Sequence, residues 1–390
     1  MEQSTQPLSI VYVTPALYMA GGVERVLTLK ANYLADHYGY DVTIVLTEGK
    51  DKPPFYPLSA KIKVVNLDLN FEELWQASFL KKIVIYLKKQ HQFRKLLRKE
   101  LMRLRPDITV SLLRREINFI NSIKDGSRKI GELHINRANY RNYDAEGGGR
   151  AKRLFARWWS ASLLSHLRQL DKLVVLTEKD CESWTELDNV MVIPDPLSFT
   201  PSQQSNLSSR RVVAVARYSH EKGIDLLLQA WAMVEKQNDD WQLDIYGDGD
   251  RQPYEQQASK LGIKRCRLHG RTNDVERAYC ESSLFVLSSR FEGFGMVIVE
   301  AMACGLPVVA FDCPWGPRSI ISNGEDGLLA ENGNVTDLSR QLLSLMNDPA
   351  RLTKMGEAAV RNVQRYRIER IAEQWKQLFE TILENKPKRA

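Results

Sequence analysis

The sequence predicts an α/β protein that contains two doubly wound parallel sheets. Short runs of β-branched and aliphatic residues alternate with longer helical patterns through both halves of the chain, as they do in parallel sheets covered by helices. A polar stretch with proline and serine at 198–209 interrupts this alternation. The length of 390 residues suits two domains. We therefore expect two Rossmann-like domains that face each other across a cleft.

The elements follow in order along the chain. Strands are predicted in the first half at 8–14, 41–47, 62–68, 107–113, 129–135 and 172–177, and in the second half at 210–217, 241–247, 266–270, 284–289 and 307–311. Helical patterns occupy 23–37, 79–105, 150–170 and 368–384. The predicted division is a first domain at 1–197, a linker at 198–209, a second domain at 210–366 and a C-terminal helical segment at 367–390.

Composition excludes several classes of protein. A hydrophobic share of 43% excludes bulk disorder, and no apolar run approaches the ~20 residues that span a bilayer. The N-terminal residues MEQSTQPLSIVYVTP lack the basic start and apolar core of a signal peptide, so we expect a cytoplasmic protein. The five cysteines are scattered without a C-x-x-C pair, which argues against a disulfide framework or a zinc site.

The most informative segment is 288–305, with the sequence SSRFEGFGMVIVEAMACG. A buried strand, a glycine-rich turn and a helix start follow one another here, and such an arrangement binds anions through free N–H groups and the helix dipole. Glu292 lies in the turn and Glu300 about one helical turn into the helix, where both can accept hydrogen bonds from hydroxyl groups. A ligand that carries a phosphate between two hydroxyl-bearing rings would use all of these groups, and a nucleotide sugar is such a ligand. The candidate donor-binding residues of this segment are Gly293, Phe294, Gly295, Met296, Val297 and Glu300, with Glu292 as a catalytic candidate.

A second candidate site is the loop RYSHEKG at 217–223, which follows the first strand of the second half. Arg217 and Lys222 are two cations that lie five residues apart on a loop that leads into a helix. A guanidinium offers a fork and an ammonium a point charge, so both can bind one diphosphate.

These motifs, together with AGGVER at 20–25 and YGDG at 246–249, resemble the retaining glycosyltransferases of the GT-B type called family 4 or group 1, and in particular bacterial UDP-sugar transferases of surface-glycan or lipid-linked oligosaccharide assembly. The resemblance implies transfer of a hexose or N-acetylhexosamine (Gal, GalNAc, Glc or GlcNAc) from a UDP-sugar to a glycan acceptor, with an α-glycosidic product. It implies no cofactor beyond the nucleotide-sugar donor, and no metal site.

The resemblance also implies roles for single residues. Arg217 and Lys222 would bind the diphosphate, Glu300 the ribose, and Glu292 the hydroxyl groups of the donor sugar. Catalysis would then consist of charge stabilisation by these cations and by the amides at 295–297, with the domains closing to expel water.

Other residues matched by the resemblance line the rest of the donor site. Gly21 and Gly22 would let the sugar approach, and His134, a further catalytic candidate, would lie near its 6-hydroxyl group. Gly247 and Gly270 would lie beside the nucleotide. The loop at 312–318 is similar to that of transferases for UDP-activated galactose-type sugars, and Trp315 within it is a candidate acceptor contact.

The helix predicted at 79–105 carries ten Lys or Arg residues and one acid, Glu100. It is either a packed helix with a solvated basic face or a surface that attracts anionic lipid and a lipid-linked acceptor. A second basic and aromatic group follows in the same domain, at Arg150, Lys152, Arg153, Arg157, Trp158 and Trp159. Nucleic acid is not expected as a partner, because no recognised binding motif accompanies the charge. We expect peripheral association with the inner face of the cytoplasmic membrane.

Two other functions fit parts of the same pattern. One is a different sugar-nucleotide enzyme of this fold, such as an epimerase, which would need no acceptor. The other is a basic membrane- or nucleic-acid-binding module without catalysis. An epimerase would release an altered free nucleotide sugar, and a binding module would show no turnover of a nucleotide-sugar donor.

Overall fold

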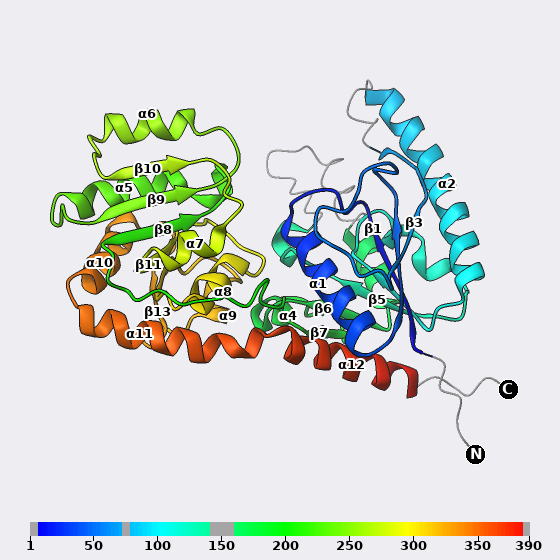
Figure 1. Ribbon diagram of the computed structural model, residues 1–390. Coiled ribbons are helices and arrows are strands. Elements are labelled where there is room, and N and C mark those ends of the chain that lie inside the picture. Colours follow the sequence, from blue (N-terminus) through cyan, green and yellow to red (C-terminus); the bar gives the residue numbers. More distant parts are fainter. Residues whose placement is uncertain (1–6, 72–78, 141–159, 385–390) are drawn as a thin grey trace, which may run out of the picture. The chain divides into compact units, whose positions relative to one another are not determined.

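The computed structural model describes residues 7–71, 79–140 and 160–384, with the backbone alone at 79–83. The chain forms two compact units (Figure 1). Unit 1 comprises Met1–Pro196 and Ile368–Ala390, and unit 2 comprises Leu197–Arg367. Each unit has its own parallel sheet, so the predicted fold class is confirmed.

Unit 1 is built on a seven-stranded sheet in the order β3-β2-β1-β4-β5-β6-β7. Its strands are β1 (Ser9–Thr14), β2 (Asp41–Leu46), β3 (Lys63–Asn66), β4 (Ile108–Ser111), β5 (Arg128–Glu132), β6 (Lys172–Val175) and β7 (Val190–Val192). The helices are α1 (Gly22–His37), α2 (Phe79–Leu104), α4 (Glu178–Ser183), α12 (Ile368–Glu384) and a helical stretch at 160–168, with short 3-10 turns η2 (Glu116–Asn118), η3 (Ile120–Ser122) and η4 (Arg137–Asn139). The strand order reverses between β1 and β4, and ligands bind at the carboxyl ends of strands at such a point.

Helices cover both faces of this sheet because side chains alternate along its strands. Ile10 and Tyr12 of β1 pack with residues of α1 and α12. Val11 and Val13 point the other way and pack with Phe93, Leu97 and Leu101, which follow one another at i, i+4 and i+8 along α2. The last helix of the chain, α12, therefore completes the core of unit 1 with its buried Trp375 and Phe379.

Unit 2 is built on a six-stranded sheet in the order β10-β9-β8-β11-β12-β13. The strands are β8 (Arg211–Val215), β9 (Gln242–Tyr246), β10 (Cys266–His269), β11 (Leu284–Leu287), β12 (Val308–Phe311) and β13 (Gly327–Ala330). The helices are α5 (Ile224–Glu235), α6 (Gln252–Lys260), α7 (Val275–Cys280), α8 (Met296–Ala303), α9 (Pro317–Ile320), α10 (Val335–Met346) and α11 (Pro349–Asn362), with 3-10 turns η5 (His220–Lys222) and η6 (Val363–Tyr366). Trp231 of α5 is the largest fully buried side chain of its core.

Two strands, β7 and β13, have no counterpart among the predicted elements. β7 has three residues and β13 has four, so neither is long enough to produce a recognisable pattern. Both lie at an edge of their sheet, where pairing with β6 and β12 provides the backbone hydrogen bonds. Tertiary pairing therefore decides their conformation, and local propensity does not.

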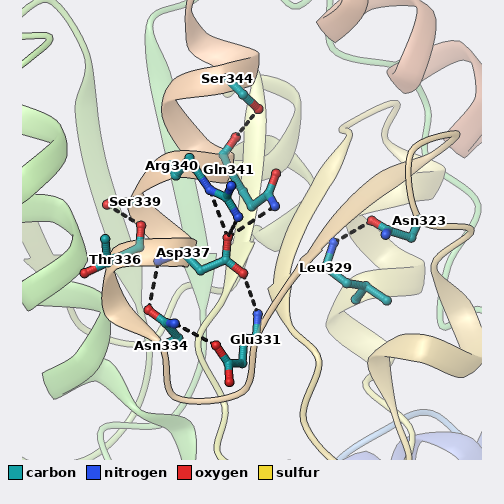
Figure 2. A network of polar contacts seen from close by, with 10 residues as sticks. All are labelled: Asn323, Leu329, Glu331, Asn334, Thr336, Asp337, Ser339, Arg340, Gln341 and Ser344. Atoms are coloured by element: carbon teal, nitrogen blue, oxygen red, sulfur yellow. Dashed lines mark hydrogen bonds and ion pairs between the residues drawn. The ribbon is translucent and has the colours of Figure 1, made fainter.

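The start of α10 shows how polar side chains fix a helix next to the edge strand β13 (Figure 2). Asn334 is the N-cap and accepts a hydrogen bond from the amide of Asp337 at 3.0 Å. Asp337 in turn accepts from the amide of Glu331 at 2.8 Å and from the guanidinium of Arg340. These bonds satisfy groups at the helix start, so this network is structural.

The polar stretch at 198–209 is hydrogen-bonded within unit 2. Ser202 donates to the carboxylate of Glu276, and the amide of Ser205 donates to the carbonyl of Cys304 at 2.8 Å. The basic and aromatic group at 150–159 lies outside the described residues.

Candidate functional site

The glycine-rich turn after β11 leads directly into α8, as the sequence predicts. Gly295 is the N-cap of α8 and has a φ of 104°, which favours glycine. The amides of Met296 and Val297 stand in the first turn, where no intrahelical carbonyl is available to them. The side chain of Phe294 is buried and packs edge-on against Tyr366 at 5.4 Å, so this residue is placed to contact a ligand through its backbone.

Glu292 and Lys222 form the centre of the site in unit 2. The Nζ atom of Lys222 lies 2.7 Å from Oε1 of Glu292, and Ser289 donates a second hydrogen bond to the same oxygen at 2.6 Å. The side chains of Lys222 and Glu292 are 19% and 9% exposed. The structure therefore joins two residues that the sequence places in separate motifs, and each neutralises the charge of the other.

Arg217 does not join this pair. Its side chain is 70% exposed, and its guanidinium donates to the carboxylate of Glu221 at 3.0 Å. An exposed pair of this kind contributes little to stability, so Arg217 can exchange Glu221 for a phosphate at low energetic cost. Glu221 is a residue that the sequence reasoning did not single out.

A second ion pair holds the two loops of the site together. Arg290 donates two hydrogen bonds to the carboxylate of Asp225, at 2.8 and 2.7 Å, and one to the carbonyl of His220 at 2.7 Å. These hydrogen bonds hold the pKa of Asp225 below its ordinary value. Because Arg290 precedes Glu292 by two residues and His220 precedes Lys222 by two, this bidentate pair fixes both sides of the central contact. Sequence reasoning missed both Arg290 and Asp225.

Glu300 is buried within unit 2 and already has partners there. Its carboxylate accepts hydrogen bonds from the hydroxyl of Ser198 and, at 3.1 Å, from that of Tyr279. Only 4% of Glu300 is exposed. A ribose hydroxyl that binds Glu300 would therefore join or displace one of these two hydroxyl groups, neither of which the sequence indicated.

The glycines predicted beside the nucleotide differ in their surroundings. A Cβ atom at Gly247 would overlap the carbonyl oxygen of Ala216, so glycine is required there for packing. No atom lies within 4 Å of the Cβ position of Gly270, so packing does not require a glycine there. Between them, the rings of Tyr246 and His269 stack with centroids 4.3 Å apart, and His269 lies 2.8 Å from the carboxylate of Asp244.

The loop at 312–318 packs directly on the glycine-rich turn. A Cβ atom at Gly316 would come within 2.7 Å of Cβ of Glu292 and would also crowd the carbonyl of Phe294. Trp315 has a φ of 75°, which is unusual for a bulky residue. Strained backbone of this kind concentrates at functional sites, so Trp315 remains a candidate acceptor contact.

Unit 1 contains the remaining predicted residues. Gly21 is the N-cap of α1, and Gly22 is the first residue of that helix. His134 follows β5 and is buried, with its ring nitrogens 3.3 Å from carboxylate oxygens of Glu132 and Asp195. Burial alone would lower the pKa of His134, but Asp195 and Glu132 raise it to about 9.

Within residues 7–71, 79–140 and 160–384, no group of three or more His, Cys, Asp or Glu side chains is placed to hold a metal ion. In the same part of the chain, no helix combines the length and the apolar character needed to cross a bilayer.

Known proteins resemble this chain in sequence and in fold. Residues 199–362 match the family described as glycosyl transferases group 1. An uncharacterized glycosyltransferase of Haemophilus influenzae is 30% identical over 365 residues, which are 92% of this chain and 96% of that protein. A poly(ribitol-phosphate) alpha-N-acetylglucosaminyltransferase of Staphylococcus aureus is 26% identical over 67% of this chain and 52% of its own length. The structure of an S. aureus TarM mutant in complex with Fondaparinux, alpha-GlcNAc-glycerol and UDP shares the fold, with a TM-score of 0.74 and 17% identity over 95% of this chain and 99% of that one.

Proposed function

The chain belongs to the glycosyl transferases group 1 family, and on that premise we propose that it transfers a hexose or N-acetylhexosamine from a UDP-sugar to a glycan hydroxyl with retention of the α configuration. It has the GT-B fold and is a glycosyltransferase whose donor is a nucleotide sugar. The anomeric proton coupling of the purified product tests retention, and a β-linked product would contradict it.

The contact between Lys222 and Glu292 carries the proposal. It places an ammonium group and a carboxylate 2.7 Å apart, beside a turn that ends at the N-terminus of α8. An ammonium group and a helix N-terminus attract a diphosphate, whereas a carboxylate accepts hydrogen bonds from sugar hydroxyls. A nucleotide sugar presents these two chemistries next to each other.

We infer the following sequence of contacts from this geometry. The diphosphate pairs with Lys222 and Arg217 and so replaces their present partners, Glu292 and Glu221. The carboxylate of Glu292 then accepts hydrogen bonds from the hydroxyl groups of the donor sugar. As the glycosidic bond breaks, negative charge grows on the diphosphate, and these two cations and the amides at 295–297 stabilise it. The acceptor hydroxyl oxygen forms the new bond to the anomeric carbon and its proton passes to the departing diphosphate, so these residues contribute positioning and charge stabilisation.

The two units have different proposed roles. Residues 210–366 bind the nucleotide through Glu300, Gly247 and Gly270, and residues 1–197 bind the acceptor. By the family resemblance, Gly21, Gly22 and His134 of the first unit are proposed as contacts of the donor sugar. The S. aureus relative is named as an α-N-acetylglucosaminyltransferase, which supports N-acetylhexosamine as the first sugar to test.

UDP should raise the melting temperature of the protein, because a ligand that binds only the folded state stabilises it. Millimolar UDP, GDP and ADP are compared, each with and without a chelator. The shift should shrink in Arg217→Met and persist in Arg210→Met. Arg210 is a matched control because it directly precedes β8, the strand that Arg217 follows, and has its own exposed partner in Asp240. If no nucleotide produces a shift, the nucleotide site is wrong, and a shift that the chelator removes contradicts metal independence.

We also propose that α2 brings the enzyme to a lipid-linked acceptor at the inner face of the cytoplasmic membrane. Val84 and Leu87 are 68% and 61% exposed, and they continue into the exposed basic residues Lys88, Lys95 and Arg98 on one stripe of the helix. Exposed apolar side chains next to cations suit an anionic lipid surface. Lys89 has a different role, because its Nζ atom donates to the carbonyls of Leu69 and Asn70 at 2.6 and 2.8 Å.

Reversal of Lys88, Lys95 and Arg98 to Glu should release the protein from anionic vesicles and lower activity on a lipid-linked acceptor. Each cation near such a surface is worth about 1 kcal/mol, so three reversals remove most of a salt-sensitive attraction. The control reverses three exposed lysines of unit 2, Lys236, Lys260 and Lys264, which changes net charge equally. Vesicle binding is measured by sedimentation at two salt concentrations. Equal binding by both triple variants would show that α2 is only a packed helix with a solvated face.

A further inference from the structure

The loop that follows β4 in unit 1 has a strained backbone that neighbouring side chains hold in place. Leu113 has a φ of 53°, which is unusual for a bulky residue. Its amide donates to Oγ of Ser111 at 3.0 Å, and its carbonyl accepts from the hydroxyl of Tyr140 at 2.8 Å. Oε1 of Glu116 accepts from the hydroxyl of Ser111 at 2.7 Å and from the amide of Arg114 at 3.0 Å. Strained backbone that is fixed in this way concentrates at functional sites.

This loop presents the guanidinium group of Arg115 in a defined orientation. Its Cζ atom lies 4.4 Å from the centroid of the Phe71 ring, and its Nη1 atom lies 3.9 Å from Oε1 of Glu48. The second distance is too long for a hydrogen bond, and the guanidinium makes none with the described parts of the chain. The side chain is 33% exposed. The N–H donors of Arg115 are therefore available to a ligand.

The arginines of this loop reach the surface, whereas the carboxylates beside them are buried. Arg114 is exposed and directly precedes Arg115. Glu48 and Glu116 are 4% and 2% exposed, and each accepts a backbone amide, that of Phe71 at 3.1 Å in the case of Glu48. A guanidinium matches two oxygens of a phosphate or carboxylate with its fork of N–H groups. The loop is thus suited to an anionic ligand group.

The place of the loop in unit 1 connects it to the acceptor. It lies at the carboxyl end of β4, where the strand order reverses and where parallel sheets bind their ligands. Helix α2 supports it, because Nε2 of Gln90 donates to the carbonyl of Arg115 at 2.8 Å. The exposed Leu87 precedes Gln90 by three residues, about 4.5 Å along the helix axis. One helix therefore carries the exposed apolar and basic stripe and also contacts the arginine loop.

We propose that Arg115, with Arg114 beside it, binds a phosphate group of the acceptor. This inference rests on the proposed function, because the acceptor is that of the transferase reaction. A lipid-linked glycan carries its phosphate between the lipid and the sugars, so a lipid that lies against α2 brings this group to the loop. A phosphodiester within a glycan chain has the same chemistry. Arg115 contacts the acceptor away from the reacting atoms and determines which acceptors bind well.

Arg115→Met tests the contact by calorimetric titration with geranyl diphosphate, a soluble prenyl diphosphate. The protein is first saturated with UDP, so that the diphosphate site of unit 2 is occupied. Loss of the charged donors should raise the dissociation constant about 10-fold or more. Arg115→Lys should recover part of the affinity, because it keeps the charge but lacks the fork.

Arg137→Met is the matched control within the same unit. The guanidinium of Arg137 also lies over an aromatic ring, that of Trp184 at 5.0 Å, and its side chain is 30% exposed. Its donors are already bonded to the carboxylate of Glu186, at 2.7 and 2.8 Å. The affinity for geranyl diphosphate should therefore change little in this variant. Equal dissociation constants in Arg115→Met and Arg137→Met overturn the proposal.

Two more probes identify the source of the anionic group. Glycerophosphoglycerol presents a phosphodiester without a lipid, and methyl glucuronide presents a carboxylate. Dependence on Arg115 that is confined to geranyl diphosphate assigns the phosphate to a lipid linkage, and dependence shared with glycerophosphoglycerol assigns it to the glycan chain as well. Dependence seen with the glucuronide alone overturns the proposal.

Turnover with a phosphate-bearing acceptor is then compared between the two variants. Arg115→Met should raise the KM for this acceptor about 10-fold and leave kcat close to that of Arg137→Met, because the contact lies away from the reacting atoms. A loss confined to kcat contradicts the assignment. Failure of the proposed function is recognised separately, since the UDP melting shift would then be absent while binding of geranyl diphosphate is measured without turnover.

Discussion

Glu292→Ala should lower turnover by about 100-fold or more while the protein remains folded. Glu292 is the partner of Lys222 at 2.7 Å, and in the proposed reaction its carboxylate accepts hydrogen bonds from the donor sugar. Removal of this group leaves the half-buried ammonium of Lys222 without its counter-charge. It also leaves the hydroxyl groups of the donor sugar without the carboxylate that accepts their hydrogen bonds. The loss should appear mainly in kcat, because binding of the nucleotide relies on other groups. Initial rates with a labelled UDP-sugar and an acceptor glycan measure it.

Two further variants separate the chemical role from the ion pair. Glu292→Gln keeps an oxygen that can accept from Ser289 but loses the charge, and the Glu292→Ala, Lys222→Met double variant removes both charges. Glu221→Ala is the control: its carboxylate also pairs with a cation of the site, Arg217, but is proposed to be displaced when the donor binds. Near-normal turnover in Glu292→Ala would show that the sugar contact is misassigned. Release of altered free nucleotide sugar in place of a glycosylated acceptor would point to an epimerase.

The sequence predicts the fold well because the continuous apolar run of a parallel strand that is buried on both faces is a local property. Ile10 and Tyr12 of one such run pack on one side of the sheet and Val11 and Val13 on the other, so both faces are covered. The helix α12 is predicted at 368–384, the bounds at which it is observed, because its apolar residues recur regularly. β13 escapes detection because its four residues form a strand only through pairing with β12.

The site is less accessible to sequence reasoning, since its key contacts join residues far apart in the chain. The motifs of Lys222 and Glu292 predict contacts with different parts of the donor, and nothing local indicates that these residues pair across 70 positions. Ser198 is a comparable case: composition places it in a linker, yet its hydroxyl donates to Glu300. Lys30 looks like an ordinary helix lysine, and only the fold shows that it is buried beside Glu132.

Gly223→Ala should be the most disruptive single substitution in the diphosphate loop. Gly223 has a φ of 62°, and a Cβ atom there would overlap the carbonyl oxygen of Ser288 at the end of β11. The backbone conformation costs an alanine about 1–2 kcal/mol, and the overlap adds about 1–3 kcal/mol because a carbonyl cannot yield as a flexible side chain can. The loop that carries Lys222 must then move away from the turn that carries Glu292. We expect a lower melting temperature and loss of the UDP shift together.

Gly262→Ala separates the two contributions. Gly262 has a φ of 71°, almost the same backbone conformation, but no atom lies within 4 Å of its Cβ position. This variant therefore bears the conformational cost alone, which corresponds to a melting temperature about 2–4 °C lower for each kcal/mol in a unit of this size. Its UDP shift should equal that of the unaltered protein. Equal melting temperatures in the two variants would mean that the loop at 217–223 does not rest on the end of β11, and with that the proposed coupling of Lys222 to Glu292 would lose its structural basis.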